Sequence, residues 1–434
     1  MSTREHAAPA LAVRAAAHGP SVVLLALCLF VAATNRWLSW EGGVRLLTAR
    51  DVTSYEAIAR AAPGLPGADL PAHHAERFPV HWVVGTLDDV LGAPLHALYR
   101  VLMIAAMAGT LALLHAIVAR RLPVAAYAVV VGAFVLNPYA LRYQLLVPGM
   151  LADATFVLGI AVALFGLAGR RAWAVVAGMA LAAVARETVL PVVPVVIAWL
   201  ALAPDWRAEP GRRRALVGGA VVVAVGAIYA VTRAIAAGFS APSLPGVLDA
   251  GAVARGYSLP APSLSTLDDY TLLDALSAPG TLAEHLARVA TPPLAMVALI
   301  AAVLVIARRR GVRPPFPFWG CLALSASIVA QPLLVSPDVL FGNETRLTAL
   351  GLLPLAAAPA FVLERLRPDL ETALRPRDVL LIVGVLAVAS LHHLYTVVGP
   401  TSPSQIAPIQ LVAGALAAWL LVRAARLAPR APAA

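Results

Sequence analysis

The chain has 434 residues, of which 60% are hydrophobic and only 13% are charged. Soluble domains carry about 25% charged residues, so this composition excludes an ordinary soluble protein and indicates a membrane protein. All 33 basic residues are arginine, and the formal net charge is +10. The arginines sit in short loops beside apolar segments, which is explained by membrane orientation. No nucleic-acid partner is expected.

A transmembrane helix needs about 20 mostly apolar residues. Segments that approach this length recur along the whole chain, and we predict an all-α polytopic membrane protein of about 12 transmembrane helices. They form a single domain over residues 1–434, with no soluble domain. The predicted spans are 20–38, 94–119, 122–138, 152–169, 172–186, 188–204, 215–237, 291–307, 317–335, 347–364, 378–394 and 406–424.

Charge alternates between successive loops. Every second segment, starting from the N-terminus, is basic, and together these hold 21 arginines against seven acids, a balance of +14. The remaining segments hold 12 arginines against 16 acids, a balance of −4. By the positive-inside rule, both termini are predicted to be cytoplasmic, in the cytoplasmic membrane.

The pair of spans 172–186 and 188–204 could instead be one long tilted helix. One crossing fewer would place most of the later arginines outside, against the same rule. The sequence therefore favours a turn at Arg186-Glu187.

Two predicted external segments are long, 39–93 and 238–290. In the first, the spacing of Asp51 and Tyr55 suits an interfacial helix with Asp51 in its first turn, where a carboxylate is favoured. Asp51 is thus either a helix cap or a general base. Farther on, Glu76 and Arg77 precede a short apolar helix over 79–91 that is too short to span. In the second segment, 281–289 has a helical pattern.

Other charged residues lie at the predicted outer ends of spans. Asp153 begins an apolar span, so it is either an N-cap or a functional group, since ionisable residues at membrane depth are costly. Arg186 and Glu187 either neutralise each other or serve a site. Four arginines lie at the predicted outer ends of spans. A guanidinium group binds phosphate through two hydrogen bonds, so these arginines are candidates for a phosphate site. They are Arg77, Arg142, Arg186 and Arg346.

Several common sites are missing from the sequence. Without lysine there is no Walker A motif, and no two aspartates are spaced Asp-x-Asp as in nucleotide-sugar enzymes. External histidines could bind a metal, but we interpret them as solvated loop residues; they are His73, His74, His81, His392 and His393.

Taken together, the outer residues resemble the GT-C superfamily of integral-membrane glycosyltransferases. The resemblance covers residues 20 to 365 and rests on order and topology rather than on one specific motif. Its parts are Asp51 followed by Tyr55, Arg77-Phe78-Pro79, Asn137-Pro138 before Asp153, Arg186-Glu187-Thr188, and Glu344 and Arg346 before Pro354. The chain departs from some members because Asp51 has no adjacent acid and no soluble domain follows the spans.

The resemblance implies a polyprenyl-phosphate-linked sugar as donor, an acceptor hydroxyl on a glycan, lipid or protein, and action on the outer face of the membrane. It implies Asp51 as catalytic base and Arg77, Arg142, Arg186 and Arg346 as groups for the donor phosphate. A supporting role is expected for Tyr55, Glu76 and Glu187. Mg²⁺ or Mn²⁺ could assist, with Asp153 or Glu344 as ligands. The alternative function is a lipid-linked sugar flippase or another secondary transporter, which would use the same spans.

Overall fold

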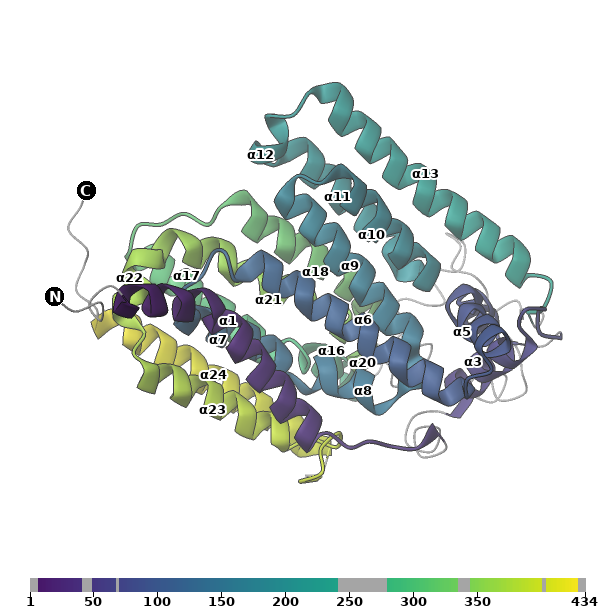
Figure 1. Cartoon of the computed structure of the whole chain (residues 1–434), viewed down its shortest axis with the longest axis horizontal. Coiled ribbons are helices and arrows are strands. Elements are labelled where there is room, and N and C mark those ends of the chain that lie inside the picture. Colours follow the sequence, from purple (N-terminus) through teal and green to yellow (C-terminus); the bar gives the residue numbers. More distant parts are fainter. Residues whose placement is uncertain are drawn as a thin grey trace.

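The computed structural model describes residues 7–40, 49–67, 70–240, 279–334, 344–399 and 403–427. Within these ranges the secondary structure is helical, apart from two isolated bridges that join Asn35 to Thr396 and Leu70 to Ser240. The all-α prediction is therefore confirmed (Figure 1). The main helices are α1 (Ala7–Thr34), α3 (Ala49–Ala61), α5 (Phe78–Leu91), α6 (Leu95–Val118), α7 (Val124–Val135), α9 (Leu151–Gly169), α10 (Ala172–Ala185), α11 (Val192–Leu202), α13 (Gly211–Ala236), α16 (Pro279–Ala290), α17 (Leu294–Arg309), α18 (Phe316–Leu334), α21 (Leu352–Leu363), α23 (Pro376–Leu391) and α24 (Pro403–Leu427).

Short helices fill the connections between these long ones. Two helices predicted in the long segments between spans are confirmed, since α5 matches the helix expected over 79–91 and α16 contains 281–289. The rest of the long segment 238–290, from 241 to 278, lies outside the described residues. The short helices are α4 (Ala72–Ala75), η1 (Pro138–Arg142), α8 (Tyr143–Leu146), η2 (Pro148–Met150), η3 (Glu187–Val189), α12 (Pro204–Arg207), α20 (Glu344–Ala349), η6 (Glu364–Leu366) and α22 (Arg367–Ala373).

Six of the described helical segments are long and apolar enough to cross a membrane, and the number reaches eight if each of two bent pairs is one span. This indicates a membrane protein. Every predicted span range contains a helix, but several are short: α10 has 14 residues and α11 has 11. A total of twelve spans stays a prediction.

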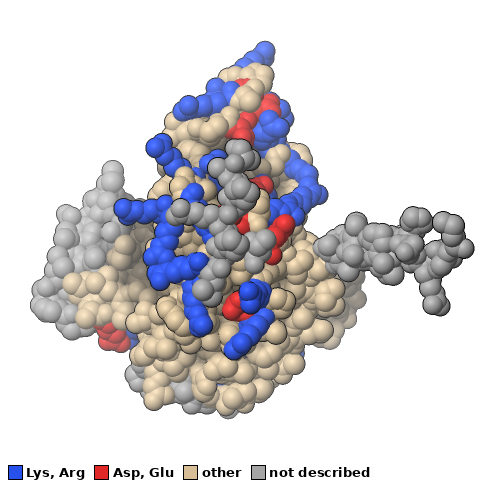
Figure 2. Space-filling view, turned by 90° about the vertical axis from the view of Figure 1, so that its left-hand side faces the viewer, with Lys and Arg blue, Asp and Glu red and all other residues tan. Residues whose placement is uncertain are grey.

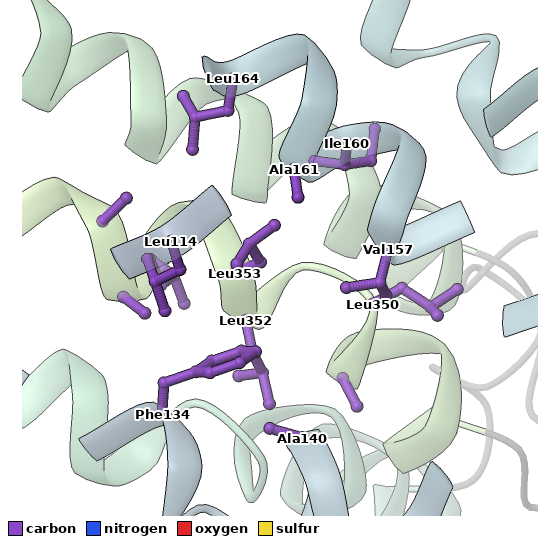
Figure 3. Packing of buried hydrophobic residues seen from close by; sticks show 14 of the residues in the cluster. Leu114, Phe134, Ala140, Val157, Ile160, Ala161, Leu164, Leu350, Leu352 and Leu353 are labelled. Carbon is purple, nitrogen blue, oxygen red and sulfur yellow. The ribbon is translucent and has the colours of Figure 1, made fainter. Parts of the chain in front are cut away.

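The centre of the bundle is the segment formed by α20 and α21, which is almost entirely buried. A helix that is apolar all round belongs inside a protein rather than at its surface. Figure 3 shows this core, in which side chains from α6, α7 and α9 surround α21. The labelled residues at its middle are Leu114, Phe134, Val157, Leu164, Leu352 and Leu353.

The antiparallel pair α9 and α10 is held at unusually close range by glycine. A Cβ atom on Gly178 would lie 2.3 Å from the backbone nitrogen of Ala163, and one on Gly159 would lie 2.6 Å from that of Ala182. Small residues let helix backbones approach in this way. The contact fixes the first turn of α9 beside the last turn of α10, where Asp153 and Arg186 lie.

The basic loops meet at one end of the bundle, which we call the arginine-rich end (loops 119–123, 170–171, 203–214, 308–315 and 364–377). Ion pairs cross between these loops, including Arg121 with Glu364 at 3.3 Å and Arg170 with Glu209 at 3.8 Å. Figure 2 shows arginine side chains spread over this face, which is the left-hand side of Figure 1. Both the start of α10 and the end of α11 lie at this end, so the chain reverses at 186–191, as predicted.

Candidate functional site

Asp51 lies in the first turn of α3, which packs backbone to backbone against α5. A Cβ atom on Gly85 of α5 would lie 1.8 Å from the carbonyl oxygen of Ala59, so only glycine allows this approach. The Asp51 side chain is buried, and its Oδ1 lies 2.7 Å from Nε2 of His74. The other ring nitrogen of His74 lies 2.9 Å from the Ser54 hydroxyl. The His74 ring therefore bridges the Asp51 carboxylate and the Ser54 hydroxyl.

Arg346 connects Asp51 to a second carboxylate. Its Nη1 donates to Oδ2 of Asp51, and its Nε donates to Oδ2 of Asp153 at 2.6 Å. Arg186 donates to Oδ1 of Asp153. Asp153 is completely buried, and the N-cap of α9 is Met150, so the N-cap interpretation of Asp153 is wrong.

Arg77 forms the third connection. Its Nη2 donates to Oε1 of Glu187 at 2.7 Å, and its Nη1 donates to the Tyr55 hydroxyl at 3.0 Å. Arg186 approaches the neighbouring Glu187 only to 3.9 Å. The main partner of Arg186 is therefore Asp153, and the pair Arg186–Glu187 is not a self-contained ion pair.

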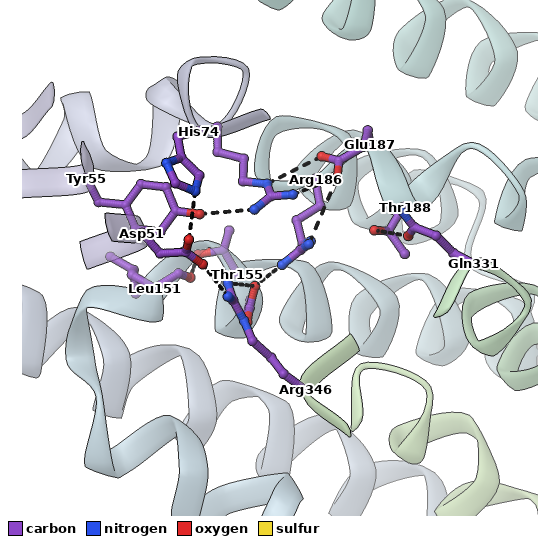
Figure 4. Close-up of polar contacts among 12 residues, drawn as sticks. Asp51, Tyr55, His74, Leu151, Thr155, Arg186, Glu187, Thr188, Gln331 and Arg346 are labelled. Carbon is purple, nitrogen blue, oxygen red and sulfur yellow. Dashed lines mark hydrogen bonds and ion pairs between the residues drawn. The ribbon is translucent and has the colours of Figure 1, made fainter. Parts of the chain in front are cut away.

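Six charged groups form one network, because the 3.9 Å contact between Arg186 and Glu187 joins the two sets of pairs. We call this network the charge cluster, and Figure 4 shows it in part. Three carboxylates balance three guanidinium groups, and the members come from segments far apart in sequence. Removing so many charges from water is costly, and buried ionisable groups in a membrane protein indicate a functional site. The members are Asp51, Arg77, Asp153, Arg186, Glu187 and Arg346.

Electrostatics keep the members outside the spans charged. Burial alone would raise the pKa of Asp51, but His74 and Arg346 outweigh it and hold that pKa well below the usual range. Burial lowers the pKa of Arg77, but Glu187 and Tyr55 together raise it by more, so the guanidinium stays protonated. Asp51 in this state is an anion already held by cationic and hydrogen-bonding partners.

Three of the predicted site residues lie elsewhere. Arg142 is fully buried and binds α1 and α23, with Nη2 at 2.9 Å from the Thr34 hydroxyl and Nε at 2.8 Å from that of Ser390. Among the described residues it shares no partner with the other three predicted phosphate-binding arginines, so the structure does not bring it together with them. Glu344 faces His285 and Arg288 at 3.5 and 3.6 Å. Glu76 pairs with Arg233 at 3.2 Å at the rim.

The interpretation of the external histidines as solvated is wrong for several of them. His74, His81 and His393 are buried, whereas His392 is exposed. His81 stacks on the Tyr55 ring, with centroids 4.0 Å apart, and burial followed by Arg77 lowers its pKa to about 3. His81 is therefore a neutral support beneath Tyr55. His74 is the site residue that the sequence pattern missed.

The predicted metal ligands do not fit Mg²⁺ or Mn²⁺. Two guanidinium groups lie against the Asp153 carboxylate, and Glu344 belongs to a separate group of charges. Among the described residues, the group that could hold a metal is Asp51 with His73 and His74, whose ligand atoms lie within 4.8 Å of one another. Arg346 already donates to Asp51 there.

Comparison with known proteins gives no relative for this chain: no family model, no curated protein and no solved structure matches it.

Proposed function

We propose that this chain is a membrane glycosyltransferase that moves a sugar from a polyprenyl-phosphate donor to an acceptor hydroxyl. The observation that supports the proposal is the convergence of the charge cluster. Its residues come from α3 and the turn before α5, the start of α9, the turn between α10 and α11, and α20. A scaffold has no need to bury three carboxylates and three guanidinium groups together.

The donor phosphate would enter by exchange of partners. Each guanidinium in the cluster is already paired with carboxylate, and phosphate offers the same bidentate geometry. When the phosphate takes Arg346, Oδ2 of Asp51 loses its charged donor while Oδ1 keeps His74. The carboxylate then becomes a stronger base, because the loss of a neighbouring cation raises its pKa.

The transfer step follows from this arrangement. Asp51 removes the proton from the acceptor hydroxyl, and the hydroxyl oxygen attacks the anomeric carbon from the face opposite the phosphate, so the configuration inverts. The bond from the anomeric carbon to the phosphate oxygen breaks, and its electron pair leaves on the polyprenyl phosphate. Arg77, Arg186 and Arg346 stabilise that anion, because guanidinium groups aimed at developing charge lower the barrier.

Transport is the alternative, and the position of the cluster favours an enzyme. Transporters place their binding sites near the middle of the membrane, often at paired broken helices. Here Asp153 lies in the first turn of α9, and Arg186 caps the end of α10. The cluster thus lies at the helix ends opposite the arginine-rich end. By the positive-inside rule, the arginine-rich end faces the cytoplasm, so the cluster would lie at the outer face of the cytoplasmic membrane.

Native mass spectrometry of the purified protein tests the donor. We expect wild type to retain a polyprenyl phosphate or its glycoside and Arg77→Gln to lose it. Arg233→Gln is the matched control, because Arg233 also pairs with a glutamate at this end but lies outside the cluster. Bulk phospholipid alone on wild type, or equal retention by Arg77→Gln, would contradict the proposal.

A further inference from the structure

Two adjoining cavities open at the arginine-rich end, far from the charge cluster. The first, which we call the arginine cavity, has a volume of about 300 Å³ and is lined by Arg120, Arg121 and Arg171. Among the described residues that line it, Glu364 is the single acid, so the charge of this lining is +2. Such an excess of cationic groups around a hollow predicts an anionic ligand.

The second cavity, the aromatic cavity, has a volume of about 340 Å³ and shares Arg121 and Glu364 with the first. Its wall includes Trp199, Trp206 and Phe316. The wall also holds Asp205, Glu364 and Arg365 beside Arg121, so the charges of its lining balance, and Trp199 and Trp206 are themselves buried. The excess of cationic groups is therefore confined to the arginine cavity.

Aromatic rings hold two of the guanidinium groups of the arginine cavity in place. The guanidinium carbon of Arg121 lies 4.8 Å from the ring centre of Phe361, and that of Arg171 lies 4.4 Å from the ring centre of Phe165. Arg121 also faces Glu364 at 3.3 Å. Stacked guanidinium groups lose less conformational freedom when they bind, so they form a prepared site for phosphate.

Exposed tryptophans show at what depth the cavities lie. Trp173 near the start of α10 is 67% exposed, and Trp319 near the start of α18 is 53% exposed. Exposed tryptophans on membrane helices mark the level of the lipid headgroups. Trp173 follows Arg171 by two residues and Trp319 follows Phe316 by three, so both cavities lie at headgroup level.

We propose that the arginine cavity binds the phosphate of an anionic phospholipid headgroup from the leaflet at the arginine-rich end. Arg120 and Arg171 contact the phosphate from the solvent side, and Arg121 contacts it from the wall that divides the cavities. Basic pockets between transmembrane helices bind anionic headgroups in this way. The site is separate from the donor site and does not depend on the glycosyltransferase proposal.

The test is native mass spectrometry of the detergent-purified protein with added phosphatidylglycerol or phosphatidylcholine. Wild type should bind one phosphatidylglycerol in preference to phosphatidylcholine. The double variant Arg120→Gln/Arg171→Gln should bind phosphatidylglycerol about 30-fold more weakly, since each arginine near a lipid surface contributes about a fivefold factor. Arg212→Gln/Arg309→Gln is the control, because it removes the same charge from exposed arginines that line neither cavity.

A second variant should increase the affinity for phosphatidylglycerol. Glu364→Gln removes the one acid of the arginine cavity, so phosphatidylglycerol should bind more tightly to it than to wild type. The proposal is overturned if the double variant binds like wild type, if the control pair loses as much binding, or if Glu364→Gln weakens it. It is also overturned if inorganic phosphate displaces the lipid at equal concentration, because the ligand would then be a free anion.

Discussion

The two ends of the helix bundle use arginine in opposite ways. At the arginine-rich end the side chains outnumber the acids, and many are exposed; Arg170 is 51% exposed and lies 3.8 Å from its nearest acid. In the charge cluster the arginines are buried and matched one for one by carboxylates; Arg186 is 2% exposed and bonds to Asp153. An excess of exposed positive charge sets the orientation of a membrane protein. Buried, matched charges do not set orientation, and their burial is costly, so they indicate a different role.

Ion pairs at the two ends also differ in how much they contribute to the free energy of unfolding. Exposed ion pairs contribute about 0–1 kcal/mol each, because water already solvates both partners. Breaking a buried pair by removing one partner costs about 3–5 kcal/mol, because the other charge is left uncompensated. Substitutions at the two ends should therefore differ sharply in effect.

The largest effect on stability is expected at Asp153. Asp153→Asn leaves Arg186 and Arg346 without their shared counter-ion, and we expect unfolding free energy to fall by about 3–5 kcal/mol. Thermal unfolding in detergent measures this loss. Asp205→Asn at the arginine-rich end is the matched control and should unfold like wild type, since Asp205 is exposed. Equal loss in both variants would remove the distinction between the ends.

Arg142 sharpens the comparison, because it is buried but lies outside the charge cluster. Arg142→Gln removes hydrogen bonds to Thr34 and Ser390, and we expect a loss of about 1.5–3 kcal/mol in stability. Polyprenyl-phosphate binding by the folded variant should equal that of wild type in the same mass spectrum. If folded Arg142→Gln fails to bind polyprenyl phosphate, Arg142 takes part in binding the donor.

The pH dependence of transfer tests the exchange of partners at Asp51. The pKa of Asp51 in the free protein is lowered, so kcat/KM should hold as pH falls below about 4, the ordinary value for aspartate. With donor bound, Arg346 turns to the phosphate and the pKa rises, so kcat should begin to fall at a higher pH than kcat/KM. Coincident acid limbs would mean that Arg346 stays on Asp51.

The contribution of Asp51 to the free energy of unfolding also falls at low pH, as the rate of transfer does. A lowered folded pKa contributes stability above the unfolded value, and that contribution is lost as pH falls through the lowered value.

His74→Gln keeps a donor near Asp51 but removes the titratable ring. We expect its kcat/KM limb to move toward the ordinary aspartate pKa while folding is retained. An unchanged limb would show that His74 does not hold the carboxylate.

The smallest effect is expected for a single exposed arginine at the arginine-rich end. Arg309→Gln should change the unfolding free energy by less than about 0.5 kcal/mol, since surface substitutions rarely do more. Thermal unfolding at low and high salt is the measurement. A loss comparable to that of Asp153→Asn would show that the exposed arginines also form a structural network.

The sequence predicts the helical class, the turn at Arg186 and the candidates Asp51 and Asp153, because apolar length and misplaced charge are local signals. It does not distinguish Arg142 from Arg346, since both lie at the ends of apolar segments. Only the packing shows that one meets Ser390 and the other meets two aspartates. The sequence does not reveal that His74 is buried for the same reason, because the packing that buries it involves residues distant in sequence.

One paired assay tests whether Asp51 is the base in a sugar transfer. Membranes that carry Asp51→Asn or Asp89→Asn are supplied with radiolabelled polyprenyl-phosphate-linked monosaccharides, and transfer to acceptor is counted. Asp89 is exposed in the same segment between α1 and α6, so its variant makes the same chemical change away from the cluster. We expect Asp51→Asn to lose about 10²–10⁴-fold in rate while Asp89→Asn keeps the wild-type rate. Transfer by Asp51→Asn at the wild-type rate would contradict the account.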